Sequence, residues 1–142
     1  MSSEDRFHDN PSGAVTDIKF NLQWLPKDSW QDLGKWLDWE GMLAYRRLVN
    51  QLYAGGACDW RFPTKEEALA FYIGDLRQND FEGQEAHIHP LFVRKCAYYM
   101  WTGDADENGQ VFRINLRTGE TDYVDKTTRE FQAVRLVRDL KH

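Results

Sequence analysis

The hexapeptide DWRFPT at residues 59–64 constrains the fold of this chain more than any other part of the sequence. Trp60 and Phe62 alternate with charged residues, and the following proline restricts Phe62 to extended backbone, so both aromatic side chains are expected to be core anchors. Thr64 is a good N-cap, and Glu67 stands where a capping box requires it. The sequence therefore predicts an extended bridge that leads into a helix. Arg61, between the two anchors, is expected to be held by a nearby carboxylate.

A helix is also expected before this bridge. From Asp38 onward, apolar residues recur at spacings of three and four, which is typical of an amphipathic helix, and Gly55-Gly56 is expected to end it. The apolar stripe consists of Trp39, Met42, Tyr45, Val49, Leu52 and Tyr53. The helix that follows the bridge is expected to continue to Leu76, with Gly74 as an earlier possible end.

Short strands are expected on both sides of these helices. Partial alternation of apolar and polar residues over 14–24 predicts one or two hairpins, whereas 25–37 has no persistent period and is expected to be a packed loop. Four further strands are expected at 97–101, 110–116, 121–124 and 131–137. Because short turns separate them, antiparallel pairing is expected, which together with segregated helices predicts an α+β fold.

The chain length of 142 residues is that of one domain. Residues 1–13 are expected to form a polar N-terminal arm that ends in a turn at Pro11-Ser12-Gly13, and 14–142 a single domain. Eighteen basic against 23 acidic residues give a net charge of -5, with no long basic run, so nucleic-acid and membrane partners are not expected. The polar N-terminus, without an apolar stretch, indicates a cytoplasmic protein.

Residues spread over nearly the whole chain resemble the Lcl C-terminal domain family, a bacterial module named after a collagen-like adhesin. The matching residues are Arg6-Phe7, Asp9-Asn10, Gly13, Val15-Thr16-Asp17, Leu22 and Trp24 near the start, Tyr53-Ala54-Gly55, Asp59-Trp60-Arg61-Phe62-Pro63-Thr64 and Glu66-Glu67 in the centre, and Tyr99, Trp101-Thr102 and 134–138 near the end. The resemblance implies a C-type-lectin-like fold, in which two helices pack on small twisted antiparallel sheets and an irregular loop region presents a ligand surface.

Two segments carry residue types that bind metals. Asp104, Asp106 and Asn108, followed by a glycine, match the start of a calcium loop, although the twelfth position is Asn115 in place of a carboxylate. The alternative is an acidic hairpin loop. His87 and His89, with Asp80, Glu82 and Glu85 nearby, could bind zinc or iron through one face of an extended segment. The alternative is a solvated loop with local hydrogen bonds.

No catalytic motif is present: the chain has no G-x-S-x-G, no H-E-x-x-H and no phosphate-binding glycine loop. Cys58 and Cys96 have no C-x-x-C neighbour or adjacent histidine and are expected to be buried, inert thiols. We therefore expect no enzyme activity and, calcium apart, no cofactor.

The favoured hypothesis is a non-catalytic module that binds a small glycan-like ligand or a protein partner. Its surface is expected to comprise the 79–90 loop, with His87 and His89, and the 102–109 hairpin; Trp30, Trp36 and Trp101 are the aromatic candidates, because Trp often dominates binding surfaces. The alternative is an accessory or regulatory subunit that docks on a larger intracellular enzyme assembly through exposed aromatic residues and the polar arm.

Overall fold

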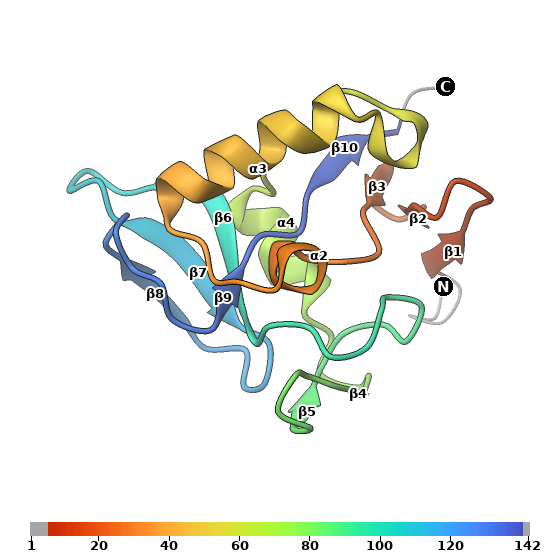
Figure 1. Cartoon of the computed structure of the whole chain (residues 1–142). Helices are drawn as coiled ribbons and strands as arrows, with labels where there is room; N and C mark the ends of the chain where they lie inside the picture. Colours follow the sequence, from red (N-terminus) through yellow and green to blue (C-terminus); the bar gives the residue numbers. More distant parts are fainter. Residues whose placement is uncertain (1–5, 141–142) are drawn as a thin grey trace.

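Helices and small sheets combine in the computed structural model, which describes residues 6–140 (Figure 1). The helices are α2 (Ser29–Leu33), α3 (Trp39–Gln51) and α4 (Lys65–Phe71), with a 3-10 turn η1 (Ala54–Gly56). The strands are β1 (Phe7–Asp9), β2 (Val15–Asp17), β3 (Leu22–Trp24), β4 (Gln78–Asn79), β5 (Glu85–Ala86), β6 (Tyr99–Ala105), β7 (Val111–Asn115), β8 (Thr121–Val124), β9 (Gln132–Ala133) and β10 (Val137–Asp139). This confirms the α+β class.

The first sheet joins the two ends of the described chain in the order β1-β2-β3-β10, with antiparallel pairing throughout. Arg6 and Phe7 are buried, and Arg6 forms an ion pair of 2.6 Å with Asp17. The prediction of a polar arm is therefore wrong for residues 6–9, which belong to or adjoin β1, whereas the predicted turn at Pro11-Ser12-Gly13 is confirmed by a hydrogen bond of 2.9 Å from the Gly13 amide to the Asn10 carbonyl. Residues 1–5 of the predicted arm lie outside the described residues.

The second four-stranded sheet has the order β8-β7-β6-β9, and a separate pair is formed by β4 and β5. The β6–β7 and β7–β8 pairs are antiparallel, as predicted, but β9 pairs with β6 in parallel. The prediction of one continuous strand at 131–137 is also wrong. The segment is divided into two strands: β9 pairs with β6, whereas β10 belongs to the first sheet and pairs with β3.

The bridge and its capping box are confirmed. Trp60 and Phe62 are 2% and 8% exposed. Arg61 exchanges two backbone hydrogen bonds with Val137, of 2.8 and 3.0 Å, which holds the bridge in extended form. Thr64 and Glu67 make both hydrogen bonds of the capping box at the start of α4.

The helix ends and the loop before α3 depart from the prediction. Helix α3 ends at Gln51, and Leu52 and Tyr53 are 70% and 63% exposed, so they do not belong to the buried stripe. Helix α4 ends at Phe71, because Tyr72 is already extended. The predicted packed loop contains α2, which begins with a second capping box formed by Asp28 and Gln31. That spacing was readable in the sequence.

A buried arginine holds the segment that carries α2. Arg135 is 1% exposed and donates hydrogen bonds to the backbone oxygens of Leu25 and Pro26. Burial lowers the pKa of Arg135 and raises that of the neighbouring Asp28, whose carboxylate accepts a hydrogen bond from the Ala97 amide at 2.8 Å. Because each group has hydrogen-bonding partners in the interior, their burial is tolerated.

The two cysteines have different environments. Both are free thiols. Cys96 is buried, as predicted, whereas Cys58 is exposed, so the prediction of two buried thiols is wrong for Cys58. Cys58 lies just after η1, where the chain runs along the surface before Trp60 enters the core.

Candidate functional site

Five aromatic side chains gather on one surface, although they come from separate parts of the chain. Trp30 lies in α2, Trp36 in the loop after it, Phe81 after β4, Tyr98 before β6 and Phe131 before β9. The first four are partly exposed, and Phe131 is 41% exposed. We call this group the aromatic surface.

Phe81 lies among the other four rings. Its centroid is 5.0 Å from that of Trp30 and 5.1 Å from that of Trp36, and these two indoles stack on each other at 5.1 Å. Phe81, Tyr98 and Phe131 have nearly parallel rings, with interplanar angles of 4° to 18° and centroids 5.6 to 6.2 Å apart. Such distances are typical of favourable aromatic pairs. The surface is therefore a packed group, held by ring contacts across four segments.

The backbone that carries these rings is also specific. Phe131 has a φ of 53°, in the left-handed region that bulky residues rarely adopt. The amide of Phe81 donates to the carbonyl of Cys96 at 2.9 Å, and the carboxylate of Asp80 accepts from the amides of Glu82 and Gln84. Backbone strain of this kind persists only where surrounding contacts hold it, and it is enriched at functional sites.

A polar rim borders the aromatic surface. The guanidinium of Arg117 lies 3.9 Å from the ring centroid of Tyr98 and also binds the carboxylates of Asp80 and Glu82. Tyr98 contacts Tyr99 at 4.8 Å between centroids. Beyond Tyr99 is a hollow of about 240 Å³, lined by Tyr99, Asn115, Glu120, Thr121 and Asp122. Partly exposed rings and hydrogen-bonding side chains thus lie next to each other, a combination suited to binding.

A family model, the Lcl C-terminal domain, matches residues 13–138. The chain belongs to the Lcl C-terminal domain family. The matched residues include the DWRFPT bridge and all five members of the aromatic surface. Comparison with curated proteins and with solved structures gave no match.

Of the three tryptophans predicted as ligand contacts in this Lcl C-terminal domain, two lie on the aromatic surface and one does not. Trp30 and Trp36 stack on each other there. Trp101 is 0% exposed, and its ring packs in the core near Trp39, at 6.3 Å between centroids. The prediction of Trp101 as a surface contact is therefore wrong, because β6 turns this side chain inward.

The two histidines contact other parts of the domain. His89 is buried against Phe7, with ring centroids 5.0 Å apart, so the prediction that it lines an accessible surface is wrong. His87 is partly exposed, and its Nδ1 atom lies 2.9 Å from the Leu76 carbonyl oxygen. Its ring contacts Tyr72 edge to face. The neighbourhood of His87 is thus the segment after α4.

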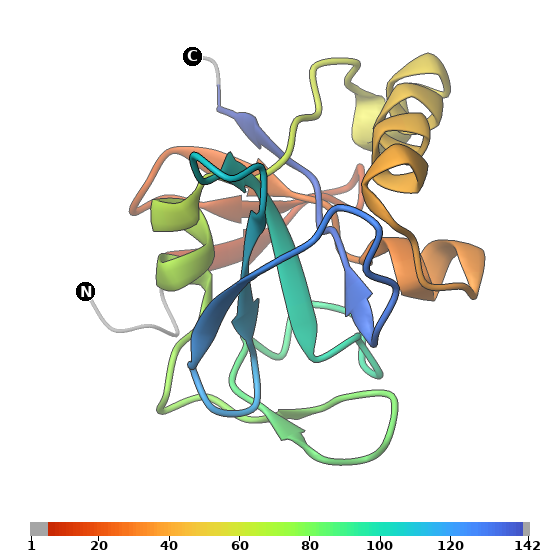
Figure 2. The same ribbon diagram turned by 90° about the vertical axis from the view of Figure 1, so that its left-hand side faces the viewer.

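The two loops predicted to share one ligand surface lie at opposite ends of β6. The 79–90 segment contacts the chain before β6, where the Phe81 amide donates to the Cys96 carbonyl, whereas 102–109 comprises the far end of β6, with its bulge, and the turn to β7. Figure 2 shows the green 79–90 segment at the bottom and the teal hairpin in the upper half of the molecule. The predicted joint surface is therefore wrong, although Phe81 of the first loop contributes to the aromatic surface.

The residues of the predicted calcium loop have structural contacts. The carboxylate of Asp104 accepts a hydrogen bond from the amide of Lys65, at the start of α4. The carboxylate of Asp106 accepts from the amides of Asn108 and Gln110 at 2.9 and 3.0 Å. Over residues 6–140, no group of three or more His, Cys, Asp or Glu side chains is arranged to hold a metal ion. Calcium binding stays a prediction.

Sequence reasoning missed Phe81, Tyr98 and Phe131. Phe81 stands in a polar loop, and Tyr98 and Phe131 fall in the strands expected at 97–101 and 131–137, where the sequence pattern did not separate a surface ring from a core ring. Their long-range contacts are the only feature that unites them.

Within residues 6–140, the helices are too short or too polar to cross a membrane.

Proposed function

We propose that the protein is a non-catalytic binding module whose ligand lies on the aromatic surface. The observation that carries this proposal is the exposure of Phe131, Trp30 and Trp36 together on one face, with Phe131 held in an unfavourable backbone conformation. Contiguous apolar patches with a polar rim are typical of interaction sites. Trp and Tyr also carry much of the binding energy where such patches meet a ligand.

A small glycan-like ligand fits this surface best. Saccharide rings have apolar faces and hydroxyl groups at their edges, so they need ring faces next to hydrogen-bonding side chains. The aromatic surface offers partly exposed rings, and the hollow beside Tyr99 offers Asn115, Glu120 and Asp122. The net charge of -5 favours a neutral glycan over a sulfated one.

A glycan array tests this proposal with wild type, Trp36→Ala and Tyr53→Ala. Tyr53 is the matched control, since it is an exposed aromatic residue outside the aromatic surface. We expect wild type and Tyr53→Ala to bind the same glycans and Trp36→Ala to lose at least tenfold in affinity. Absence of glycan binding by the wild type would reject the glycan proposal.

The second candidate function is that of an accessory subunit on a larger intracellular enzyme assembly. Its support is an exposed apolar group at the end of α3, where Leu48, Leu52 and Tyr53 are 43%, 70% and 63% exposed. This end of α3 is at the top of Figure 1, beside η1. A pull-down from native cells would recover an enzyme with the wild type and lose it with Leu52→Asp. Recovery of the monomeric protein alone would count against this function.

We also propose a cytoplasmic location and a C-type-lectin-like arrangement. The location is supported by the exposed free thiol of Cys58, because a reducing compartment keeps such a thiol unpaired. Cell fractionation tests it, and recovery outside the cytoplasm would contradict it. The fold proposal is supported by small antiparallel sheets with α3 and α4 beside them (Figures 1 and 2). An experimental structure compared with C-type lectin domains tests it.

A further inference from the structure

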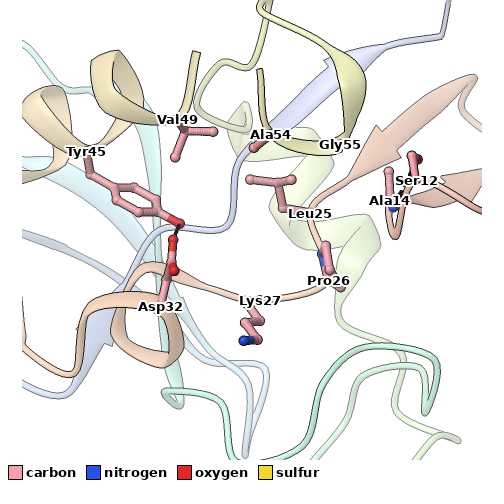
Figure 3. Close-up of a pocket in the computed structure, with 10 residues that line it drawn as sticks. All are labelled: Ser12, Ala14, Leu25, Pro26, Lys27, Asp32, Tyr45, Val49, Ala54 and Gly55. Atoms are coloured by element: carbon pink, nitrogen blue, oxygen red, sulfur yellow. Dashed lines mark hydrogen bonds between the residues drawn. The ribbon is translucent and has the colours of Figure 1, made fainter. Parts of the chain in front are cut away.

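A separate pocket of about 210 Å³ opens between α2, α3 and the segments around Ala14 and Leu25 (Figure 3). Its apolar wall includes Leu25 and Val49, which are 7% and 4% exposed. In Figure 3 these two side chains point toward the space between Tyr45 and Ala54. The volume is below the roughly 300 to 1,000 Å³ that drug-sized ligands occupy. Any ligand held here is therefore small.

One side of this pocket is polar. The hydroxyl of Tyr45 donates a hydrogen bond to Oδ2 of Asp32 at 2.9 Å (Figure 3). Burial, reinforced by Asp32, raises the pKa of Tyr45, so the phenol keeps its proton at neutral pH. Over residues 6–140, the other carboxylate oxygen of Asp32 accepts no hydrogen bond from the protein. Tyr45 and Asp32 therefore present hydrogen-bond acceptors to the pocket, and a matching ligand must supply a hydrogen-bond donor.

The charges around the pocket favour a cationic donor. Asp32 is exposed, so its carboxylate is accessible to a ligand. Lys27 also lines the pocket, but Figure 3 shows its side chain directed away from the Tyr45–Asp32 pair. The nearby Arg135 is fully buried and donates to the backbone oxygens of Leu25 and Pro26. The carboxylate of Asp32 is thus the accessible charge on the polar side, and a charge-assisted hydrogen bond to it would be strong.

We propose that this pocket is a second binding site, for a small primary amine with a short apolar body. Its ammonium group donates to Asp32 and to the lone pairs of Tyr45, and its alkyl part packs against Leu25 and Val49. The site is independent of the proposed function, because Trp30 directs its ring to Trp36 whereas Asp32, two residues on, binds Tyr45. If the protein bound no glycan, the amine site could still exist, and if it bound no amine, the proposed glycan site could still exist.

Isothermal titration calorimetry tests this inference with n-butylammonium chloride, n-butanol and sodium butyrate at neutral pH. These probes share an apolar chain and differ in the polar end. We expect saturable binding of butylammonium, at least tenfold weaker binding of butanol and no binding of butyrate. Butyrate binding as tightly as butylammonium, or no saturable binding of butylammonium, would overturn the proposal.

Variants assign the binding to this pocket. Asp32→Asn keeps the side-chain shape and an acceptor for Tyr45, and it should weaken butylammonium binding at least tenfold. Ala54→Leu narrows the pocket without a charge change and should weaken binding of butylammonium and butanol alike. Glu107→Gln, in the exposed hairpin, is the charge-matched control and should leave binding unchanged. Wild-type affinity in either pocket variant would overturn the proposal.

Discussion

The guanidinium of Arg61 donates two hydrogen bonds to the carboxylate of Glu67, at 2.7 and 2.9 Å. It also donates to Asp139 of β10 at 2.9 Å. Together with the backbone pair between Arg61 and Val137, these contacts join the bridge, α4 and β10. The expectation that a carboxylate holds Arg61 is confirmed, and this arginine serves the fold.

The contact between Arg61 and Glu67 makes the stability of the fold depend on pH. Burial raises the pKa of Glu67, but hydrogen bonds from Arg61 and from the Thr64 amide outweigh it, so the pKa lies below its usual value of 4.5. Because the folded pKa is depressed, the carboxylate stabilises the fold above about pH 4.5, and this contribution is lost as the pH falls through the folded pKa.

The matched variants are Glu67→Gln and Glu66→Gln, which neutralise neighbouring residues in the first turn of α4. Urea unfolding at pH 7 and pH 3 should show a smaller loss of stability on acidification for Glu67→Gln than for wild type. Glu66→Gln should follow the wild type, since Glu66 is exposed and makes no ion pair among the described residues. Equal acid sensitivity of all three proteins would contradict this prediction.

Two tryptophans should differ in their contributions to stability. Trp101→Ala removes a fully buried ring and should lower the free energy of unfolding by about 3 to 5 kcal/mol. Trp36→Ala removes a partly exposed ring and should cost about 1 kcal/mol. Chemical denaturation measures both. If Trp36→Ala lowered the free energy of unfolding by much more than this expected value, the aromatic surface would be part of the core.

Gly55 and Gly56 form a matched pair for steric effects. Both have positive φ, 62° and 77°, so alanine at either position should cost about 1 to 2 kcal/mol from backbone strain. A Cβ at Gly55 would also lie 3.0 Å from the Trp60 ring, whereas at Gly56 it would meet open space. Thermal denaturation should therefore show Gly55→Ala to be the less stable variant. The reverse order would contradict the placement of Trp60 against η1.

The two thiols should react at different rates. Cys58 is exposed, whereas Cys96 is buried, and burial raises the pKa of Cys96 to about 12. A thiol reagent at pH 8 should label one cysteine of the native protein within minutes and the second only in denaturant. Cys58→Ser should abolish the fast phase and Cys96→Ser should retain it. Fast labelling of Cys58→Ser would show that Cys96 is accessible.

The local features were predictable because their determinants lie a few residues apart. The Thr64–Glu67 capping box spans one helical turn, and the buried stripe of α3, from Met42 to Val49, spans about two. The same reasoning failed at Tyr53, which follows α3 in a left-handed conformation. The spacing of apolar residues could not distinguish the turn at Tyr53 from a further turn of helix. An apolar residue at position 53 was expected in both structures.

The sequence by itself determined the family, the α+β class, the extended bridge and the helix that Thr64 begins. Only the tertiary structure decided that Trp101 is buried, that β9 runs parallel to β6, and that Trp36 and Phe131 meet in the aromatic surface. The physical reason is the range of the interactions: a cap or a helical stripe is formed by near neighbours, whereas a binding surface depends on which distant segments the packed core brings together.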